Sequence, residues 1–236
     1  FFTAEGARFF LVGLQNTLRA AALAMTLSLL AGLLLAVGRL ARVRVLPRVL
    51  DSWVVFFRGI PLVILVLLFG VGLPASGVLI SNYWALVLAL TLYNSSVMAE
   101  IVRAGVLSLD RGQREAALAV GLTNGQTMRY VLLPQALRRM LPALVSQMVV
   151  VLKDTSLGVI ISYEELLRRS QLAGTAVTAD LQALFIGGVI YLVVNLLLSM
   201  VARILARSPA AGRRRGRVSP SGTEAAVYLA GTGSTL

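Results

Sequence analysis

The sequence contains no cysteine and no histidine among its 236 residues, and charged residues make up only 14% of it. Without these two residue types the chain cannot form disulfide bonds, a Cys/His zinc site, a thiol nucleophile or a serine–histidine triad. A soluble domain has about a quarter of its residues charged. Here 58% of the residues are hydrophobic, and the mean hydropathy is +0.84. These values exclude an ordinary soluble domain and indicate a membrane protein.

Acidic residues are also scarce, with 10 Asp and Glu against 22 Lys and Arg, which gives a net charge of +12. In a soluble protein such an excess would suggest nucleic-acid binding, but in a membrane protein the arginines first report topology. The single lysine, Lys153, does not lie in a Gly-x4-Gly-Lys-Ser/Thr sequence. The chain therefore lacks the usual loop that binds nucleotide phosphates.

Five stretches are candidates for helices that cross a bilayer, which takes about 20 apolar residues. The sequence predicts an all-α membrane protein with spans near residues 18–38, 53–73, 83–103, 140–162 and 181–203. The uncharged run between Arg58 and Glu100 counts as two spans because Pro74 and Gly77 supply a turn. The first span is followed by four arginines, a stop-transfer pattern, so it is expected to be an anchor and not a signal peptide.

Arginines cluster after the first span, between the third and fourth, and after the fifth, and the turn at residues 74–82 has none. The positive-inside rule then places the N-terminus outside and the C-terminus inside. Residues 208–236 are rich in Arg, Ser, Gly, Thr and Pro, and this composition is typical of a disordered cytoplasmic tail.

The cytoplasmic loop 104–139 has the features of an ordered segment. Residues 113–121 favour a helix that ends at Gly121, and the alanines 116, 117 and 119 give it a smooth surface that a partner can approach. Pro134 is expected to begin the next helix, because the first turn does not need its N–H. From this pattern alone, an amphipathic connector without a special role is an equally good interpretation.

Glu115-Ala116-Ala117, three residues, Gly121, nine residues, Val131, one residue and Leu133-Pro134 resemble the EAA loop of permease subunits from ATP-driven (ABC) importers. Val131 stands where that pattern usually has Ile. Four other segments look like those of the polar amino-acid uptake branch, the histidine/glutamine/glutamate/arginine type: Phe57–Pro61, Glu100–Gly105, Leu133–Arg138 and Lys153–Leu157.

The resemblance implies the fold of a type I ABC importer permease in the bacterial cytoplasmic (inner) membrane. It implies that the loop couples to a separate cytoplasmic ATPase dimer, which would bind ATP and Mg. This chain is expected to hold no cofactor or metal and no catalytic residue. The other implied partners are a second identical or homologous permease subunit, an extracytoplasmic amino-acid-binding protein, the amino-acid substrate and membrane lipid. The implied coupling residues are Glu115, Ala116, Ala117, Gly121, Leu133 and Pro134.

Ionisable and polar groups at membrane depth are costly, so they usually mark a path or an ion pair. Arg58 is interpreted either as an arginine that snorkels to the inner boundary or as part of a gate or ion pair. Lys153 and Asp154 either end the fourth span as a charge pair or shape the outer mouth of the path, where the backbone could be irregular. Glu100 and Arg103 are spaced to pair with each other. The candidates for the path or gate are Arg58, Asn94, Met98, Glu100, Lys153, Asp154, Thr155 and Ser156.

Two polar stripes and several glycines complete the spans. The stripe of Thr91, Asn94, Ser95 and Met98 is assigned to the path, whereas Tyr191, Asn195 and Ser199 are assigned to packing between helices, as are Gly32, Gly187 and Gly188. A stand-alone secondary transporter would need midplane carboxylates, which the spans lack. A non-transporting scaffold, the other alternative, would not need the spacing of the EAA loop.

Overall fold

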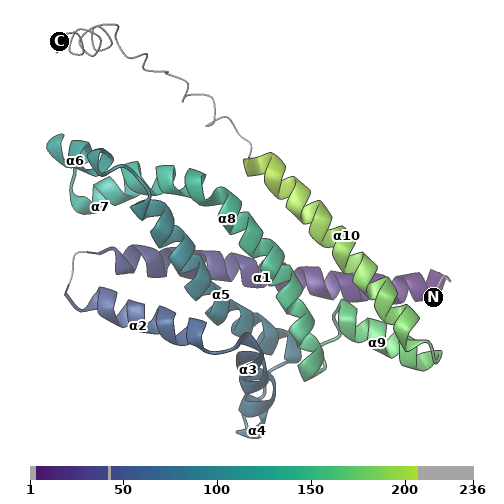
Figure 1. The fold of residues 1–236 in the computed structure, drawn as a ribbon. Coiled ribbons are helices and arrows are strands. Elements are labelled where there is room, and N and C mark those ends of the chain that lie inside the picture. Colours follow the sequence, from purple (N-terminus) through teal and green to yellow (C-terminus); the bar gives the residue numbers. More distant parts are fainter. Residues whose placement is uncertain (1–3, 42–43, 207–236) are drawn as a thin grey trace, which may run out of the picture.

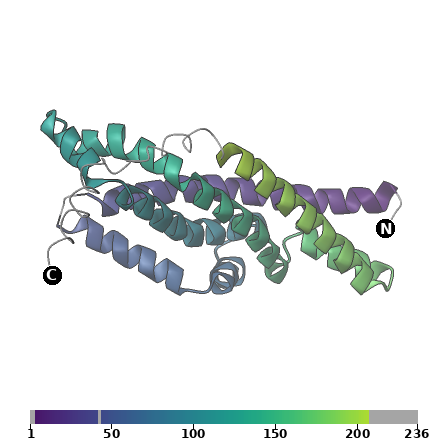
Figure 2. The ribbon, with the colours of Figure 1, turned by 45° about the horizontal axis from the view of Figure 1, so that its top comes forward.

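The structure, a computed structural model, describes residues 4–41 and 44–206, and these form helices joined by short loops, with no strand among them. The helices form an elongated bundle (Figures 1 and 2). α6 (Arg111–Ala119) and α7 (Asn124–Gln126) lie at one end, which we call the loop end, and α9 (Leu166–Ala176) lies toward the other (Figure 1). The predicted tail, 208–236, lies outside the described residues.

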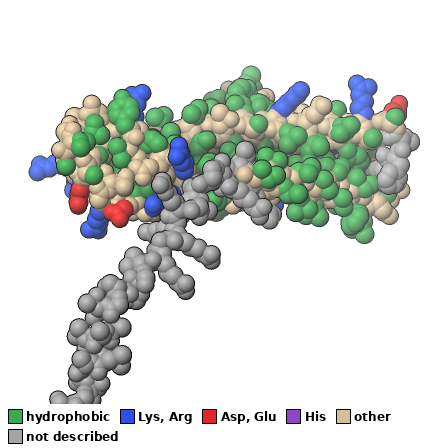
Figure 3. Space-filling view, turned by 90° about the horizontal axis from the view of Figure 1, so that it is seen from above, with side chains coloured by type: hydrophobic (Ala, Val, Ile, Leu, Met, Phe, Trp, Pro, Cys, Tyr) green, Lys and Arg blue, Asp and Glu red, His purple; other side chains and the backbone are tan. Residues whose placement is uncertain are grey.

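The described helices have the lengths and surfaces of a membrane bundle. Four of them are long and apolar enough to cross a membrane, and a bent pair brings the total to five if it counts as one span. On the face seen in Figure 3, apolar side chains cover the middle of the bundle, whereas charged side chains gather mainly at the loop end. The predicted all-α, multi-span class is thus confirmed.

α1 (Ala4–Arg39) begins far earlier than the predicted span near 18–38. Its 36 residues are about 54 Å long, more than the ~30 Å of a hydrocarbon core. Glu5, Arg8 and Arg19 interrupt the apolar run of the sequence, but their side chains are exposed. Charged residues on the exposed side of a helix do not end it. The uncharged stretch of sequence was therefore shorter than the helix itself.

α1 packs closely against α5 (Asn82–Leu107). A Cβ atom added to Gly32 would lie 2.5 Å from Met98 Cβ and 2.8 Å from the Ser95 carbonyl oxygen, so the two backbones can approach only because Gly32 has no side chain. The predicted packing role of Gly32 is confirmed, and Gly187 likewise faces Ser170. Gly188, by contrast, faces open space within this chain. Along α1 the buried residues are Phe10, Gly13, Thr17, Ala20, Ala21, Ala24, Ser28, Gly32 and Ala36.

The predicted second span, 53–73, is wrong as a single helix. α2 (Leu46–Gly59) meets the helical segment Leu62–Ala75 at an angle of 92°. Ile60, between them, is extended with φ −83° and ψ 128°. The reason is Pro61, whose ring disfavours the helical conformation in the residue before it. The segment after the break consists of α3 (Leu62–Leu67), the π-helical η1 (Leu68–Gly72) and α4 (Leu73–Ala75).

Two π-helical turns each end just before a Leu-Pro pair. η1 precedes Pro74, and η2 (Thr127–Leu132) precedes Pro134. In each case the N–H of the leucine before the proline donates to the carbonyl five residues earlier, Leu73 to Leu68 and Leu133 to Met128. Proline lacks an N–H and its ring crowds the carbonyl four residues back, so a wider turn lets the helix continue through it.

Pro134 lies in the first turn of an α-helical segment, as predicted, but this segment continues a helix that has already begun. A continuous helix runs from Asn124 to Ile161 through α7, η2, α8 (Leu133–Asp154) and the 3-10 helix η3 (Thr155–Ile161). It begins with a capping box in which the side chains of Thr123 and Gln126 satisfy each other's backbone N–H. The change to a 3-10 helix after Asp154 is the local irregularity expected at this place.

α9 and α10 (Asp180–Ala206) close the described part of the chain. α9 was not predicted, whereas the predicted fifth span, 181–203, lies within α10. α10 contacts α8 and α9, and many of its apolar side chains remain exposed, including those of Phe185, Leu192 and Val201. Because α10 is covered so little, most of its surface is available to lipid or to another subunit.

Candidate coupling loop and translocation groove

α6 is a short helix with strong signals at both ends. At its start the Asp110 carboxylate accepts a hydrogen bond of 2.7 Å from the Gly112 N–H. At its end Gly121 has φ +86°, its N–H donates to the Leu118 carbonyl, and the N–H of Leu122 donates to the Ala117 carbonyl. This pattern is a Schellman motif, which requires a residue in the left-handed conformation and favours glycine. The predicted end of the helix at Gly121 is confirmed.

α6 is fastened to the body of the chain by polar side chains. The Gln135 side-chain amide donates to Gln113 at 3.0 Å, and the Arg114 guanidinium donates to Asn124 at 3.2 Å. These bonds join α6 to α8 and to α7. In addition, Arg139 of α8 donates to the Ser108 carbonyl, just before α6, at 2.7 Å. The loop is therefore an ordered extension of the helical bundle.

The structure separates the predicted coupling residues into an outer and an inner group. Glu115 and Ala116 are exposed on α6, and Pro134 is exposed on α8. Ala117 is only 5% exposed, so it packs inward and does not belong to the surface predicted for a partner. Leu133 is partly buried and packs on the cluster of buried side chains at the loop end. The exposed surface of α6 is completed by Ala119 and Val120.

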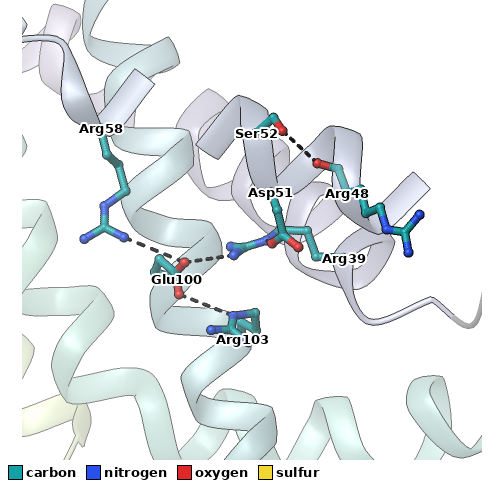
Figure 4. A network of polar contacts seen from close by, with 7 residues as sticks. All are labelled: Arg39, Arg48, Asp51, Ser52, Arg58, Glu100 and Arg103. Atoms are coloured by element: carbon teal, nitrogen blue, oxygen red, sulfur yellow. Dashed lines mark hydrogen bonds and ion pairs between the residues drawn. The ribbon is translucent and has the colours of Figure 1, made fainter. Parts of the chain in front are cut away.

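A network of ion pairs joins α1, α2 and α5 (Figure 4). The Glu100 carboxylate lies 2.9 Å from the Arg39 guanidinium, 3.4 Å from that of Arg103 and 3.7 Å from that of Arg58. Arg39 also pairs with Asp51 at 2.5 Å, and its side chain is only 5% exposed. The predicted pair of Glu100 with Arg103 is confirmed. Arg58 also has an ion-pair partner, Glu100, which supports the ion-pair interpretation of this residue. No pattern in the sequence indicated the roles of Arg39 and Asp51.

Arg58 also lines a groove of about 650 Å³ between α2, α5 and α8. Its polar lining comes from Arg58, Tyr93, Gln147 and Asp154. The side-chain amide of Gln147 donates to the buried Asn94 at 2.8 Å, and Asn94 in turn donates to the Leu90 carbonyl at 3.0 Å. Asn94 thus positions Gln147 at the groove without lining it. The groove presents a cation, an anion, an amide and a phenol in an otherwise apolar wall.

Of the residues predicted for the path, only Arg58 and Asp154 line this groove. Met98 is fully buried in the contact between α5 and α1, where Gly32 leaves room for it. Thr155 is also fully buried, and its hydroxyl donates to the Leu152 carbonyl at 2.6 Å. Met98 was assigned to the path from its place on a polar stripe, and Thr155 from its place after Lys153 and Asp154, but both side chains pack inside the bundle.

Lys153 and Asp154 face different grooves. Lys153 and Ser156 line a second groove, of about 500 Å³, together with Tyr191, Asn195 and Ser199 of α10. Within the described residues no ion pair joins Lys153 to Asp154, so the interpretation as a self-satisfied pair is wrong. Adjacent residues of a helix point about 100° apart, which explains the separation. The stripe of α10 assigned to packing lines this second groove, and its Tyr191 hydroxyl also makes the predicted kind of bond between helices, to Glu165 at the start of α9.

Sequence reasoning missed a buried carboxylate at the far end. Glu165 is fully buried and caps α9, accepting hydrogen bonds from the N–H groups of Leu167 and Arg168 and, at 2.5 Å, from the Tyr191 hydroxyl. Burial raises the pKa of the Glu165 carboxyl, and these three donors partly oppose that shift. The only signal was a glutamate just before a helix-forming run, which is typical of a helix cap and not of a buried group.

The sequence and the fold were compared with known proteins. Residues 28–210 match the family described as "Binding-protein-dependent transport system inner membrane component". The chain is 39% identical over 214 residues to the glutamate transport system permease protein GluD of Corynebacterium glutamicum, an alignment that covers 89% of this chain and 78% of that protein. It is 34% identical over 200 residues to the arginine transport system permease protein ArtQ of Bacillus subtilis, covering 84% and 91%.

Solved structures agree with this assignment. A chain from "Crystal structure of an amino acid ABC transporter with histidines" superposes with a TM-score of 0.80 at 33% identity, covering 85% of this chain and 94% of that one. A chain of the inward-facing MetNI methionine ABC transporter shares the fold with a TM-score of 0.75 at 20% identity, covering 87% and 98%. The chain therefore belongs to the family of inner-membrane components of binding-protein-dependent transport systems, the permease subunits of ABC importers.

Proposed function

We propose that the chain is the membrane-spanning subunit of an ATP-driven amino-acid importer of the bacterial inner membrane and forms half of the substrate path. The similar glutamate and arginine permeases support this substrate class. The family does not favour the alternatives of a secondary transporter or a scaffold. The partners of this proposal are a second permease subunit, an extracytoplasmic amino-acid-binding protein and a cytoplasmic ATPase dimer that binds ATP and Mg.

The observation that carries the proposal is one helix that connects the loop to the groove. Gln135 of α8 donates a hydrogen bond to Gln113 of α6, which fixes α6 to α8. Farther along, α8 places Gln147 and Asp154 in the lining of the groove. These residues lie 12 and 19 positions after Gln135, or about 18 and 28 Å along the helix axis. A displacement of α6 would therefore reach the wall of the groove through a continuous helix.

In this proposal the exposed side of α6, with Glu115, Ala116 and Ala119, docks on the ATPase. The ATPase states must bind α6 in different positions, because a partner shifts a conformational equilibrium only through different affinities for its states. Movement of α8 then switches access to the groove from one side of the membrane to the other. Arg58 and Asp154 at this groove match the carboxylate and ammonium of an α-amino acid.

Coupling is tested by co-purification of the detergent-solubilised chain with its ATPase. Glu115→Arg adds a bulky cation to the docking surface of α6, and we expect it to lose most of the bound ATPase. Thr175→Arg is the matched control, because Thr175 is exposed on α9 at the other end of the bundle, and this variant should retain the ATPase. Equal retention by both variants would show that α6 does not dock on the ATPase.

The path is tested by uptake of glutamate, glutamine and arginine into proteoliposomes that contain the assembled transporter. Asp154→Asn keeps the shape of the side chain and removes its charge. We expect it to reduce uptake at least about tenfold, the effect of losing one charge-assisted bond, with ATPase co-purification unchanged. Unchanged uptake of all three amino acids would exclude Asp154 from the path.

A further inference from the structure

A cavity at the loop end of the described chain plays no part in the proposed path. It has a volume of about 820 Å³ and lies at the loop end, between the ends of α1 and α5 on one side and α6, α7 and η2 on the other. Its apolar lining includes Leu40, Val106, Leu109, Leu118, Met128 and Leu132. Cavities of about 300–1,000 Å³ with mostly apolar walls are typical of small-molecule sites.

One face of α6 supplies charges of both signs to this cavity. Arg111 and Arg114 lie on it, Asp110 lies just before the helix, and Glu115 borders both this cavity and the exposed side of α6. Asp110 already caps the helix, and Arg114 donates one N–H to Asn124. Neither Arg111 nor Glu115 forms an ion pair with any described residue. The rim can therefore receive an anion and a cation side by side.

A buried hydroxyl in the wall lacks a partner. Thr127 lines the cavity, is only 1% exposed, and its Oγ1 has no hydrogen-bond partner among the described residues. An unsatisfied buried hydroxyl is destabilising, and buried polar groups of native proteins nearly always have a partner. This orphaned donor, together with the charged rim, indicates a bound polar group at the cavity.

The position of the cavity identifies the kind of ligand. Val37 and Val106, which line it, belong to the last turns of the apolar helices α1 and α5, so the cavity lies where these helices leave the hydrocarbon. A ligand there can place acyl chains on the apolar wall and its headgroup at the charged rim. A headgroup with both a phosphate and an ammonium complements Arg111 and Arg114 on one hand and Glu115 on the other.

We propose that this cavity binds one zwitterionic phospholipid of the cytoplasmic leaflet, with its phosphate at Arg111 and Arg114, its ammonium at Glu115 and a headgroup or ester oxygen accepting from Thr127. The assignment to the cytoplasmic leaflet rests on the proposed function, which puts α6 on that side. Lipid bound here would support α6 from behind, since the cavity lies between α6 and the membrane helices.

The test is native mass spectrometry of the delipidated chain, without ATPase, titrated with dioleoyl phosphatidylethanolamine. Arg111→Ala/Arg114→Ala should weaken the tightest lipid-binding event about tenfold or more, the effect of a lost charge-assisted contact. Arg138→Ala/Arg129→Ala, a charge-matched control on α8 and η2 outside the cavity lining, should leave it unchanged. Equal weakening by both pairs would show general attraction of lipid to a basic surface and overturn the site.

Two further arms identify the ligand. Dioleoyl phosphatidylglycerol, which lacks the ammonium, should bind the wild-type chain more weakly, and glycerophosphoethanolamine, which lacks the chains, should not compete at equal concentration. Competition by the soluble headgroup would show that the ligand is a small cytoplasmic zwitterion and not a lipid.

Thr127→Val should weaken lipid binding yet not destabilise the delipidated chain, because it removes an unsatisfied hydroxyl. Lipid affinity equal to that of the wild type would exclude the hydroxyl from the site. ATPase co-purification is scored separately, so failure here leaves the proposed coupling intact.

Discussion

Arg39, the last residue of α1, is joined to Glu100 of α5 by an ion pair of 2.9 Å, and Arg39 is almost entirely buried. Glu100 also faces Arg58 and Arg103, so one carboxylate contacts three guanidinium groups from three helices. Arg58 is the loosest of the three, at 3.7 Å and half exposed. Glu100 therefore joins α1, α2 and α5, while Arg58 stays available to the groove.

Glu100→Gln is expected to destabilise the chain far more than Arg58→Gln. The first change leaves the buried Arg39 with Asp51 alone, and breaking a buried pair costs roughly 3 kcal/mol or more. The second removes a long, half-exposed contact worth about 1 kcal/mol or less. Midpoints of thermal unfolding in detergent measure the difference. Equal midpoints for the two variants would mean that Glu100 is not the centre of the network.

Gly121→Ala should weaken the end of α6, because alanine at φ +86° is strained by about 1–3 kcal/mol. Gly125→Ala is a close control: both positions have open space around a Cβ atom, but only Gly121 has a positive φ. We expect the ATPase to co-purify less with Gly121→Ala and normally with Gly125→Ala. Similar losses for the two variants would assign the effect to added bulk and not to the Schellman motif.

Gly32→Ala tests the close contact between α1 and α5. The new methyl group would overlap Met98 and the Ser95 carbonyl, and because one neighbour is backbone, relief requires the helices to separate. Overpacking of this kind costs about 1–3 kcal/mol. Gly188→Ala on α10, which meets nothing within 4 Å in this chain, is the control. A midpoint of unfolding for Gly32→Ala that equals the control would contradict the packing.

The features predicted correctly were those determined by local sequence. Gly121 marks the end of α6 because a left-handed residue must stand there, and long apolar runs mark helices that lie in lipid. Proline was less informative. Pro61 separates two helices at 92°, whereas Pro142 lies inside α8 and Pro134 follows a π turn that keeps its helix continuous. Whether a helix bends or widens at a proline depends on neighbouring helices, which the local sequence does not contain.

The groove could be predicted only in part for the same reason. Asp154 and Arg58 were candidates because charge at membrane depth needs an explanation, and both line the groove. Met98 shares a sequence face with Asn94, but the close approach at Gly32 buries that face against α1. Tyr191, which donates to Glu165, and Arg39, which pairs with Glu100, lie on other helices far away in the sequence. Such pairings depend on how helices cross, not on spacing within one helix.

Tyr191→Phe is expected to destabilise the chain in a pH-dependent manner. The Tyr191 hydroxyl donates to the buried Glu165 carboxylate at 2.5 Å, so it stabilises the ionised form of that group. When Glu165 is ionised, loss of this charge-assisted bond costs about 1.5–3 kcal/mol, and when it is protonated the bond is neutral and its loss costs about 0.5–1.5 kcal/mol.

Because burial raises the pKa of Glu165, the smaller cost should apply up to a higher pH than for an ordinary glutamate, and the gap between variant and wild type should widen as the pH rises through that pKa. Thermal unfolding midpoints of both proteins across this pH range measure the gap. Tyr130→Phe, which removes a hydroxyl from a side chain that is 62% exposed, should stay within about 0.5 kcal/mol of wild type at every pH. A gap that is constant with pH, or that narrows as the pH rises, would show that Tyr191 does not stabilise a carboxylate, and Glu165 would then be held in its neutral form.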